Sequence, residues 1–209
     1  MMFLNLFEKV FEKLIFLKIK RYQTIDGWLS PREAVHLYRF ASRVRGPHSV
    51  LVEIGSWKGK STYCLAKGLS EGKVIAIDPF DASGEPDSVE LYQQQKGYIP
   101  IVEQFNNNMR RLNVSEKIEI LVGHSEQFAE QFSKIDLLFI DGDHSIKGCE
   151  SNFLSYSPAL VSGGYLLFHD YDPARKELGP TWVIENSVRS SPFFKLVGLF
   201  DSLWVSQKV

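Results

Sequence analysis

Short apolar segments alternate with helical patterns along most of this chain, and this alternation limits its fold more strongly than any other feature. The segments are VLVEI (50–54), VIAID (74–78), IEIL (118–121), IDLLFI (135–140) and YLLFH (165–169). The intervals have helical spacing, for example at Val102, Phe105, Met109 and Leu112. Strands that are apolar throughout and alternate with helices are typical of a parallel sheet covered on both faces. The sequence therefore predicts a doubly wound, Rossmann-like α/β fold.

The C-terminal segment departs from this pattern. The runs FKLVGLF and SLWVSQK are separated by little more than Asp201, which is too short for a parallel crossover. They predict an antiparallel hairpin that completes a mostly parallel sheet of seven strands. Before the first strand, a capping box that begins at Ser30 and a stop signal at Gly46 predict a helix from Pro31 to about Arg45.

Residues 1–21 predict an amphipathic helix added to a single domain over residues 22–209. Charged residues interrupt its apolar run, which excludes a signal-peptide core and a membrane-spanning segment. An apolar stripe recurs at three- and four-residue steps through Phe3, Phe7, Val10, Leu14 and Leu17. We expect this stripe to pack on the domain or on a second subunit in a homo-oligomer. Attachment to a membrane surface is the alternative, since Lys18, Lys20 and Arg21 follow the stripe.

Composition excludes some classes of partner. Lys and Arg total 24 against 25 for Asp and Glu, and the basic residues are dispersed, which disfavours a nucleic-acid substrate. The two cysteines, Cys64 and Cys149, follow no metal-ligand spacing and are too few for a disulfide framework. We expect both to be small core residues of a cytoplasmic protein.

The segment VEIGSWKGKST (52–62) contains Gly-Lys-Ser, the ending of a nucleotide-phosphate loop. Such a loop needs four residues between its first glycine and this ending, because that length wraps backbone N–H groups around a phosphate. Only three residues separate Gly55 from Gly59 here. The dinucleotide fingerprint G-x-G-x-x-G also fails, because position 57 is Trp57. A phosphate-binding role is therefore disfavoured.

What remains is an acidic glycine turn, from Glu53 to Gly59, between a strand and a helix that begins near Ser61. Ligands of such folds lie beyond the carboxyl ends of the strands, and a helix N-terminus there favours a carboxylate as readily as a phosphate. Asp78 ends the second strand, where it could accept hydrogen bonds from ribose hydroxyls. Glu53 could receive an ammonium group. A ligand with a ribose, an ammonium group and a carboxylate describes S-adenosylmethionine.

From about Gly27 to the C-terminus, the sequence resembles the class I S-adenosylmethionine-dependent methyltransferases. The resemblance rests on VEIGSWKGKST, VIAIDPF, LLFIDGDHSIKGCESNF and YSPALVSGGYLLFHDY, in the family's order and spacing. It implies that the donor is bound by Glu53, Gly55, Ser56, Gly59, Ser61, Asp78, Gly123, His124 and Ser125. Alternatively, the glycines only permit a tight turn and Asp78 only caps a strand end.

Acids and imidazoles also follow the fourth and fifth strands, at Asp141, His144, His169 and Asp170. This part resembles the metal-dependent O-methyltransferases that act on catechols and macrolide sugars. The resemblance implies a divalent metal, Mg²⁺ or alternatively Mn²⁺, bound by Asp141, His169 and Asp170. It also implies that Asp141 and His144 are catalytic, with His144 as the general base. Alternatively, His144 and its neighbour Asp143 only form a pair or cap the helix that follows.

We therefore expect O-methylation of a small-molecule hydroxyl on a sugar, glycoside or phenol. Residues 81–98 and 171–182 are candidate lids, from which Tyr92, Tyr98 and Trp182 could stack on an acceptor ring. Two alternatives remain open. One is a cephalosporin-hydroxylase-like enzyme on the same fold, which would depend on Fe²⁺ and 2-oxoglutarate. The other is a binding or scaffold protein without enzymatic activity.

Overall fold

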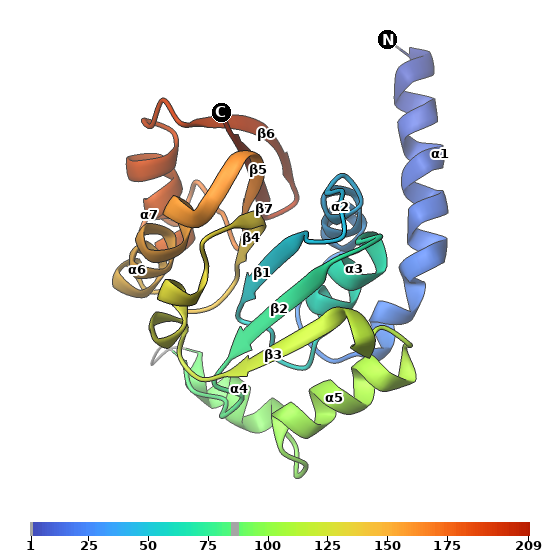
Figure 1. Ribbon diagram of the computed structural model, residues 1–209, viewed down its shortest axis with the longest axis vertical. Coiled ribbons are helices and arrows are strands. Elements are labelled where there is room, and N and C mark those ends of the chain that lie inside the picture. The colour runs from blue at the N-terminus through green and yellow to red at the C-terminus, as the bar shows by residue number, and fades with distance from the viewer. Residues whose placement is uncertain (1, 85–87) are drawn as a thin grey trace.

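A single mixed sheet of seven strands organises the computed structural model, which describes residues 2–84 and 88–209 (Figure 1). The strand order is β3-β2-β1-β4-β5-β7-β6. The strands are β1 Val50–Ile54, β2 Lys73–Asp78, β3 Ile118–Val122, β4 Ile135–Ile140, β5 Leu160–Phe168, β6 Phe194–Phe200 and β7 Leu203–Lys208. The predicted fold class is confirmed, including the terminal hairpin, in which β7 pairs antiparallel with both β5 and β6.

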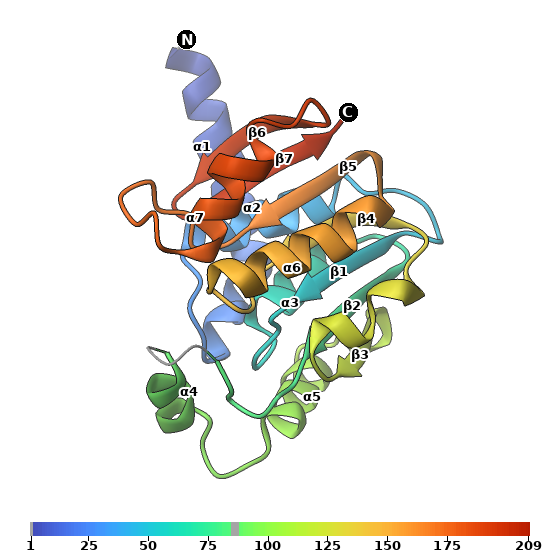
Figure 2. The ribbon, with the colours of Figure 1, turned by 90° about the vertical axis from the view of Figure 1, so that its left-hand side faces the viewer.

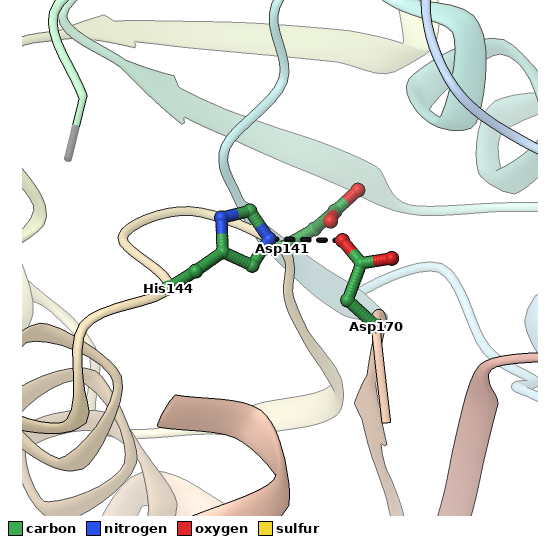
Figure 3. A group of neighbouring side chains, drawn as sticks. All are labelled: Asp141, His144 and Asp170. Carbon is green, nitrogen blue, oxygen red and sulfur yellow. Dashed lines mark ion pairs between the residues drawn. The ribbon is translucent and has the colours of Figure 1, made fainter. Parts of the chain in front are cut away.

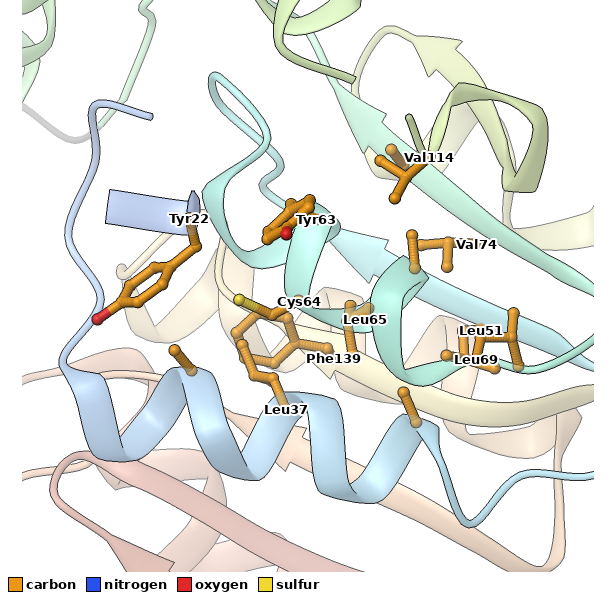
Figure 4. Close-up of a cluster of buried hydrophobic side chains, with 14 of the residues drawn as sticks. Tyr22, Leu37, Leu51, Tyr63, Cys64, Leu65, Leu69, Val74, Val114 and Phe139 are labelled. Carbon is orange, nitrogen blue, oxygen red and sulfur yellow. The ribbon is translucent and has the colours of Figure 1, made fainter. Parts of the chain in front are cut away.

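Helices cover both faces of the sheet (Figures 1 and 2). They are α1 Met2–Ile19, α2 Pro31–Ala41, α3 Lys60–Gly68, α4 Val89–Gln95, α5 Ile101–Arg111, α6 Ile146–Tyr156 and α7 Gly179–Val183. One buried cluster joins α1, α2, α3 and α5 to one face of the sheet, and a second joins α6 and α7 to the other. Figure 4 shows the first cluster between α2, α3 and the strands, with Leu37, Leu65 and Phe139 at its centre. Such double coverage explains why the strands are apolar on both faces.

The parallel strands place their carboxyl ends at one edge of the sheet. β1 is parallel to both β2 and β4, and Ile54 lies level with Ile77 on one side and Ile140 on the other. β5 continues the parallel arrangement beside β4. Residues that follow these four strands must therefore meet at the same edge. That edge is where we expect ligands in such a sheet.

The helix α2 begins as predicted and ends earlier. The Ser30 hydroxyl accepts a hydrogen bond from the Glu33 amide at 3.2 Å, and the Glu33 carboxylate accepts one from the Ser30 amide at 2.7 Å. The predicted end near Arg45 is wrong, because the helix stops at Ala41. The Ser42 hydroxyl donates to the carbonyl of Arg39 at 2.8 Å, a local bond that competes with continuation of the helix.

The described part of the predicted stripe of α1 does not pack on the domain, and its packing on a second subunit stays a prediction. Ile15 and Ile19 are buried against the domain, whereas Val10, Leu14 and Leu17 are about half exposed. The helix has apolar residues on two sides, and the side with Ile15 and Ile19 joins the buried cluster that contains residues of α2. The side chains of Phe3 and Phe7 lie outside the described residues. No helix in the described part of the chain is long and apolar enough to cross a membrane.

Both cysteines are fully buried and free, as predicted for small core residues. Cys64 lies on α3 and Cys149 on α6, on opposite faces of the sheet. Burial raises the pKa of each thiol well above its usual value, so both remain protonated at neutral pH.

Candidate functional site

A cavity of about 890 Å³ lies at the carboxyl edge of the sheet. Its size is within the usual range for small-molecule sites. The turns after β1, β2, β3, β4 and β5 all contribute to its wall. The predicted site residues that line it are Gly55, Ser56, Ser61, Asp78, Gly123, His124, Ser125, Asp141, His144, His169 and Asp170. Glu53 and Gly59 are not among the lining residues.

The glycine turn after β1 is shaped by close contact with the next strand. Gly55 has φ +90°, and a Cβ atom there would lie 2.1 Å from the backbone oxygen of Asp141. Gly59 also has φ +90° and precedes the first helical residue of α3, Lys60. Both positions therefore require glycine for steric reasons. Gly55 lines the cavity, so its backbone is also open to a ligand.

Glu53 lies beneath this turn and does not face the cavity. Its carboxylate is fully buried and accepts hydrogen bonds from the hydroxyls of Ser56, at 2.8 Å, and Thr62. Burial raises the pKa of Glu53 to about 7, although these hydroxyls and that of Ser61 act in the opposite direction. The carboxylate thus braces the turn and the start of α3. Its predicted contact with an ammonium group stays a prediction, which this placement disfavours.

Asp78 both lines the cavity and organises the neighbouring turn. One of its oxygens accepts a hydrogen bond from the Trp57 amide at 2.8 Å, and the other accepts one from the Phe80 amide at 2.6 Å. Burial raises the pKa of Asp78, and these amide donors offset part of that effect. Each carboxylate oxygen has a second acceptor site, so the group could still receive a ligand hydroxyl. The structural and ligand-binding roles are therefore compatible.

The lysines of the phosphate-loop-like segment are held away from a phosphate. Lys58 is buried, pairs with Asp26 at 3.1 Å and donates to the carbonyl of Gln95 at 2.7 Å. Lys60 donates to the carbonyl of Gly27 at 2.7 Å. The Lys58 ammonium group is therefore engaged with Asp26 and the end of α4, and that of Lys60 with the loop at Gly27. This arrangement agrees with the spacing argument against a phosphate loop.

The segment after β3 forms another wall of the cavity. Ser125 is held from below by α6, because its hydroxyl donates to the side chain of Asn152 and its carbonyl accepts from the Tyr156 hydroxyl at 2.6 Å. His124 and Asn152 line the cavity beside it. The sequence prediction did not include Asn152, since a lone amide on a helix gives no signal of its own.

Three side chains after β4 and β5 come together as a group that could hold a metal ion. Asp141, His144 and Asp170 each offer one ligand atom, and these atoms lie within 4.8 Å of one another (Figure 3). His144 Nε2 is 3.0 Å from Asp170 Oδ2. The two carboxylates are suitable ligands for Mg²⁺, whereas an added imidazole suits Mn²⁺ or another transition metal. Neither Asp143 nor His144 caps the following helix, because Ser145 does so through its hydroxyl.

His169 was predicted as a metal ligand, and its geometry disfavours that role. Its Nδ1 is 3.1 Å from Asp141 and 3.2 Å from Asp170, while its Nε2 is 3.2 Å from Glu33. Burial opposes a charge on the imidazole, but these three carboxylates raise its pKa well above the usual value. Both ring nitrogens are therefore committed to acids. The group that could hold a metal ion contains His144 and not His169.

Glu33 is the acid that sequence reasoning missed at this site. The sequence predicts Glu33 only as a capping residue. In the structure, its carboxylate also accepts hydrogen bonds from the Ser202 amide, at 3.0 Å, and from the Ser202 hydroxyl, at 2.7 Å. It therefore joins α2, the turn between β6 and β7, and His169. The capping box predicts only that Glu33 lies at the start of a helix. Its contacts with His169 and Ser202 could not be predicted in this way, because these residues are far away in the sequence.

Parts of both predicted lids line the cavity. The first contributes residues 81–84, 88, 91 and 92, and the second contributes Asp172, Arg175 and Leu178. Residues 85–87 of the first lid lie outside the described residues. Tyr92 lies at the cavity and contacts the rings of Trp28 and Trp57, both with centroids 5.5 Å away. Tyr98 is fully exposed, and Trp182 packs against the second core cluster.

Solved structures of other proteins share this fold. The O-methyltransferase TomG from Streptomyces achromogenes, solved with S-adenosylmethionine, has a TM-score of 0.64 at 14% identity, over 95% of this chain and 89% of its own. An O-methyltransferase from Bacillus cereus, solved with S-adenosylhomocysteine (SAH), has a TM-score of 0.64 at 16% identity, over 96% of this chain and 90% of its own. These likenesses confirm a Rossmann-like methyltransferase fold.

Sequence comparison gives the family. An uncharacterised protein of Acanthamoeba polyphaga mimivirus is 27% identical over 126 residues, or 59% of this chain. The match spans about half of that relative, 52% of its length. Residues 52–171 match the model of a family described as a methyltransferase domain. This match covers more than half of the chain and includes the glycine turn and the group after β4 and β5. The chain therefore belongs to this methyltransferase-domain family, as its resemblance to the class I enzymes predicted.

Proposed function

We propose that this protein transfers the methyl group of S-adenosylmethionine to a hydroxyl oxygen of a small molecule, with help from a divalent cation. One observation carries the proposal: a single cavity holds both the glycine turn with Asp78 and the group Asp141, His144 and Asp170. The first set suits a methyl donor, and the second suits the activation of an acceptor. The structures from Streptomyces achromogenes and Bacillus cereus, with S-adenosylmethionine and SAH respectively, support the choice of donor.

In this proposal, the turn after β1 and the Ser125 segment hold the donor. The N-terminus of α3 and the amides around Gly55 receive its carboxylate, and Asp78 receives its ribose hydroxyls. Gly123, His124 and Ser125 flank its adenine. Holding the methyl group and the acceptor oxygen about 3 to 3.5 Å apart and in line can lower the barrier by roughly 7 to 11 kcal/mol.

The acids after β4 and β5 prepare the acceptor. A bound divalent cation would lower the pKa of a coordinated hydroxyl and fix its oxygen in place. His144 Nε2 cannot both ligate a cation and accept a proton, so we assign the cation to Asp141 and Asp170. His144 then removes the hydroxyl proton, oriented by its contact with Asp170 at 3.0 Å. Glu33 and His169 keep these carboxylates in position.

The hydroxylase-like alternative receives less support. A non-haem Fe²⁺ site uses two histidines and one carboxylate. The group here has one histidine and two carboxylates, and His169 is committed to Glu33 and Asp141. The arrangement therefore favours a cation with oxygen ligands. Absence of methyl transfer, together with oxygen uptake that depends on Fe²⁺ and 2-oxoglutarate, would reverse this preference.

Donor binding is the first part of the proposal to test. Isothermal titration of S-adenosylmethionine into the full chain should give micromolar binding. SAH and its 2′- and 3′-deoxyribose analogues should be compared on the wild type, on Asp78→Ala and on the exposed control Glu119→Ala. If Asp78 receives the ribose, loss of a ribose hydroxyl from SAH should weaken its binding to the wild type and to Glu119→Ala by roughly ten- to a hundredfold. The affinity of Asp78→Ala should be the same for SAH and for the deoxyribose analogues. No binding to folded wild-type protein would refute the donor assignment.

Metal dependence and methyl transfer need separate measurements. Mg²⁺ should change the heat of donor binding, and Asp141→Asn should abolish this response, whereas His144→Gln should keep it. With radiolabelled donor and a panel of sugar and catechol acceptors, wild-type protein should form methyl ethers. His144→Gln should have a much lower rate of methyl transfer, and the remaining rate should no longer depend on the ionisation of this histidine. Unchanged activity in the presence of a chelator would remove the cation from the proposal.

A further inference from the structure

The outer face of α1, which we define by Val10, Phe11, Leu14 and Leu17, is an exposed apolar surface. The exposed fractions of these side chains are 49%, 51%, 54% and 52% respectively. The spacing of Val10, Leu14 and Leu17 puts them on one side of the helix, whereas the buried Ile15 and Ile19 face the domain. Phe11 lies at the border of this side next to α2, where the Arg39 guanidinium is 5.8 Å from the centre of its ring. Figures 1 and 2 show α1 at the edge of the domain, with its N-terminal turns beyond the sheet. The apolar face is therefore accessible along the described part of the helix.

The charges of α1 are divided between its two sides. Glu8 faces α2 and pairs with Arg39 at 3.0 Å. Glu12 also faces α2, where it lies 3.6 Å from His36. The basic residues of α1, Lys9, Lys13 and Lys18, are all exposed to solvent. Lys20 and Arg21 lie in the turn after α1, where Arg21 donates to the carbonyl of Arg111 at 3.2 Å. Acidic side chains thus face the domain, and the spacing of Lys9, Lys13 and Lys18 puts these lysines at the flanks of the apolar face.

We propose that the outer face of α1 binds an anionic lipid surface, with the helix lying in the plane of the membrane. Apolar side chains there would enter the boundary between headgroups and acyl chains, while the lysines extend to anionic headgroups. A second copy of this chain fits less well, because symmetric pairing of two outer faces would bring their lysines together. The helix rests on the membrane and does not span it, in agreement with its charged residues.

This surface is separate from the candidate functional site. Among the described residues, those that line the cavity begin at Gly27, and α1 contributes none of them. Changes to the outer face therefore leave donor binding intact. Lipid binding and methyl transfer can fail independently, so each proposal can be judged without the other.

Co-sedimentation of the full chain with vesicles tests the proposal. One set of vesicles contains phosphatidylcholine alone, and the other contains 30% phosphatidylserine, on the order used to model an anionic leaflet. The variants are Leu14→Ser with Leu17→Ser, and Lys9→Gln with Lys13→Gln. Leu154→Ser and Lys147→Gln on α6 serve as controls, because both side chains are exposed on the other face of the sheet. Circular dichroism and S-adenosylmethionine binding verify that each variant is folded.

We expect binding to the anionic vesicles that falls when salt is raised. Each lysine removed should weaken it roughly fivefold, the leucine variant should abolish it, and the α6 controls should match the wild type. Absence of binding to the anionic vesicles overturns the proposal. Equal binding by the leucine variant and the wild type also overturns it. A dimer in sedimentation that the leucine variant dissociates, without vesicle binding, would assign the face to a second copy.

Discussion

Replacing Glu33 by glutamine should destabilise the protein, although the side chain keeps its size. The Glu33 carboxylate accepts hydrogen bonds from the Ser30 amide and from the amide and hydroxyl of Ser202, and it faces His169. Glutamine replaces one of the two accepting oxygens by an NH₂ group, so its N–H groups would face hydrogen-bond donors on at least one side. It would also leave the His169 imidazole without one of its three acidic neighbours.

The size of the effect follows from the pKa of this carboxyl. Burial acts to raise it, but His169, Ser30 and Ser202 together lower it from 4.5 to about 2. At about 1.4 kcal/mol per pKa unit, this difference corresponds to roughly 3 kcal/mol of folding free energy. Loss of one partner from a buried ion pair costs about 3 to 5 kcal/mol, which agrees with that figure. For a chain of this size, we expect a melting temperature lower by roughly 6 to 12 °C.

The same contact predicts a pH dependence. The carboxyl is more acidic in the folded state than in the unfolded state, so its contribution to stability is complete above the unfolded value of about 4.5. It is lost as the pH falls from about 4.5 to about 2. The wild type should therefore lose stability more steeply in this range than Glu33→Gln does.

Urea denaturation at pH 7 and at a series of acidic values measures both effects. Glu71→Gln is the matched control, because Glu71 is exposed and its substitution should change stability by less than about 0.5 kcal/mol. If Glu33→Gln changes the free energy of unfolding at pH 7 by no more than the control, the reasoning about this contact is refuted. The same conclusion follows if both proteins lose stability in parallel between pH 4.5 and 2.

Two further substitutions test the turn and the core. Gly55→Ala should prevent stable folding, because its Cβ would lie 2.1 Å from a backbone oxygen. The control Gly163→Ala should have a smaller effect, because Gly163 has a similar φ of +79° and no atom lies within 4 Å of the added Cβ. The yield and melting temperature of each variant check this, and equal effects would contradict the steric argument. Phe105→Ala should lower the free energy of unfolding by about 3 to 5 kcal/mol, because the ring is fully buried. Phe193→Ala should lower it by much less, because that ring is exposed. Comparable losses for the two variants in urea denaturation would contradict this prediction.

The sequence alone determined which segments form strands and which of them are parallel or antiparallel. Apolar segments at helix-length intervals require a covered parallel sheet, and a connection as short as Asp201 requires an antiparallel one. These local patterns also indicated the glycine turn after β1 and the acids at the ends of β2, β4 and β5. Because the ends of parallel strands meet at one edge, most of the predicted residues line one cavity.

Only the tertiary structure decided what each of these side chains contacts. Glu33 and His169 are separated by more than a hundred residues, and α2 brings them together with Ser202. Glu33 engages Nε2 of His169 and Asp141 engages its Nδ1, so His144 is the histidine in the group with Asp141 and Asp170. Likewise, α1 has two apolar sides, and periodicity could not select the one that docks. Spacing along the chain predicts which residues share a face, whereas the partners of that face depend on distant elements that pack against it.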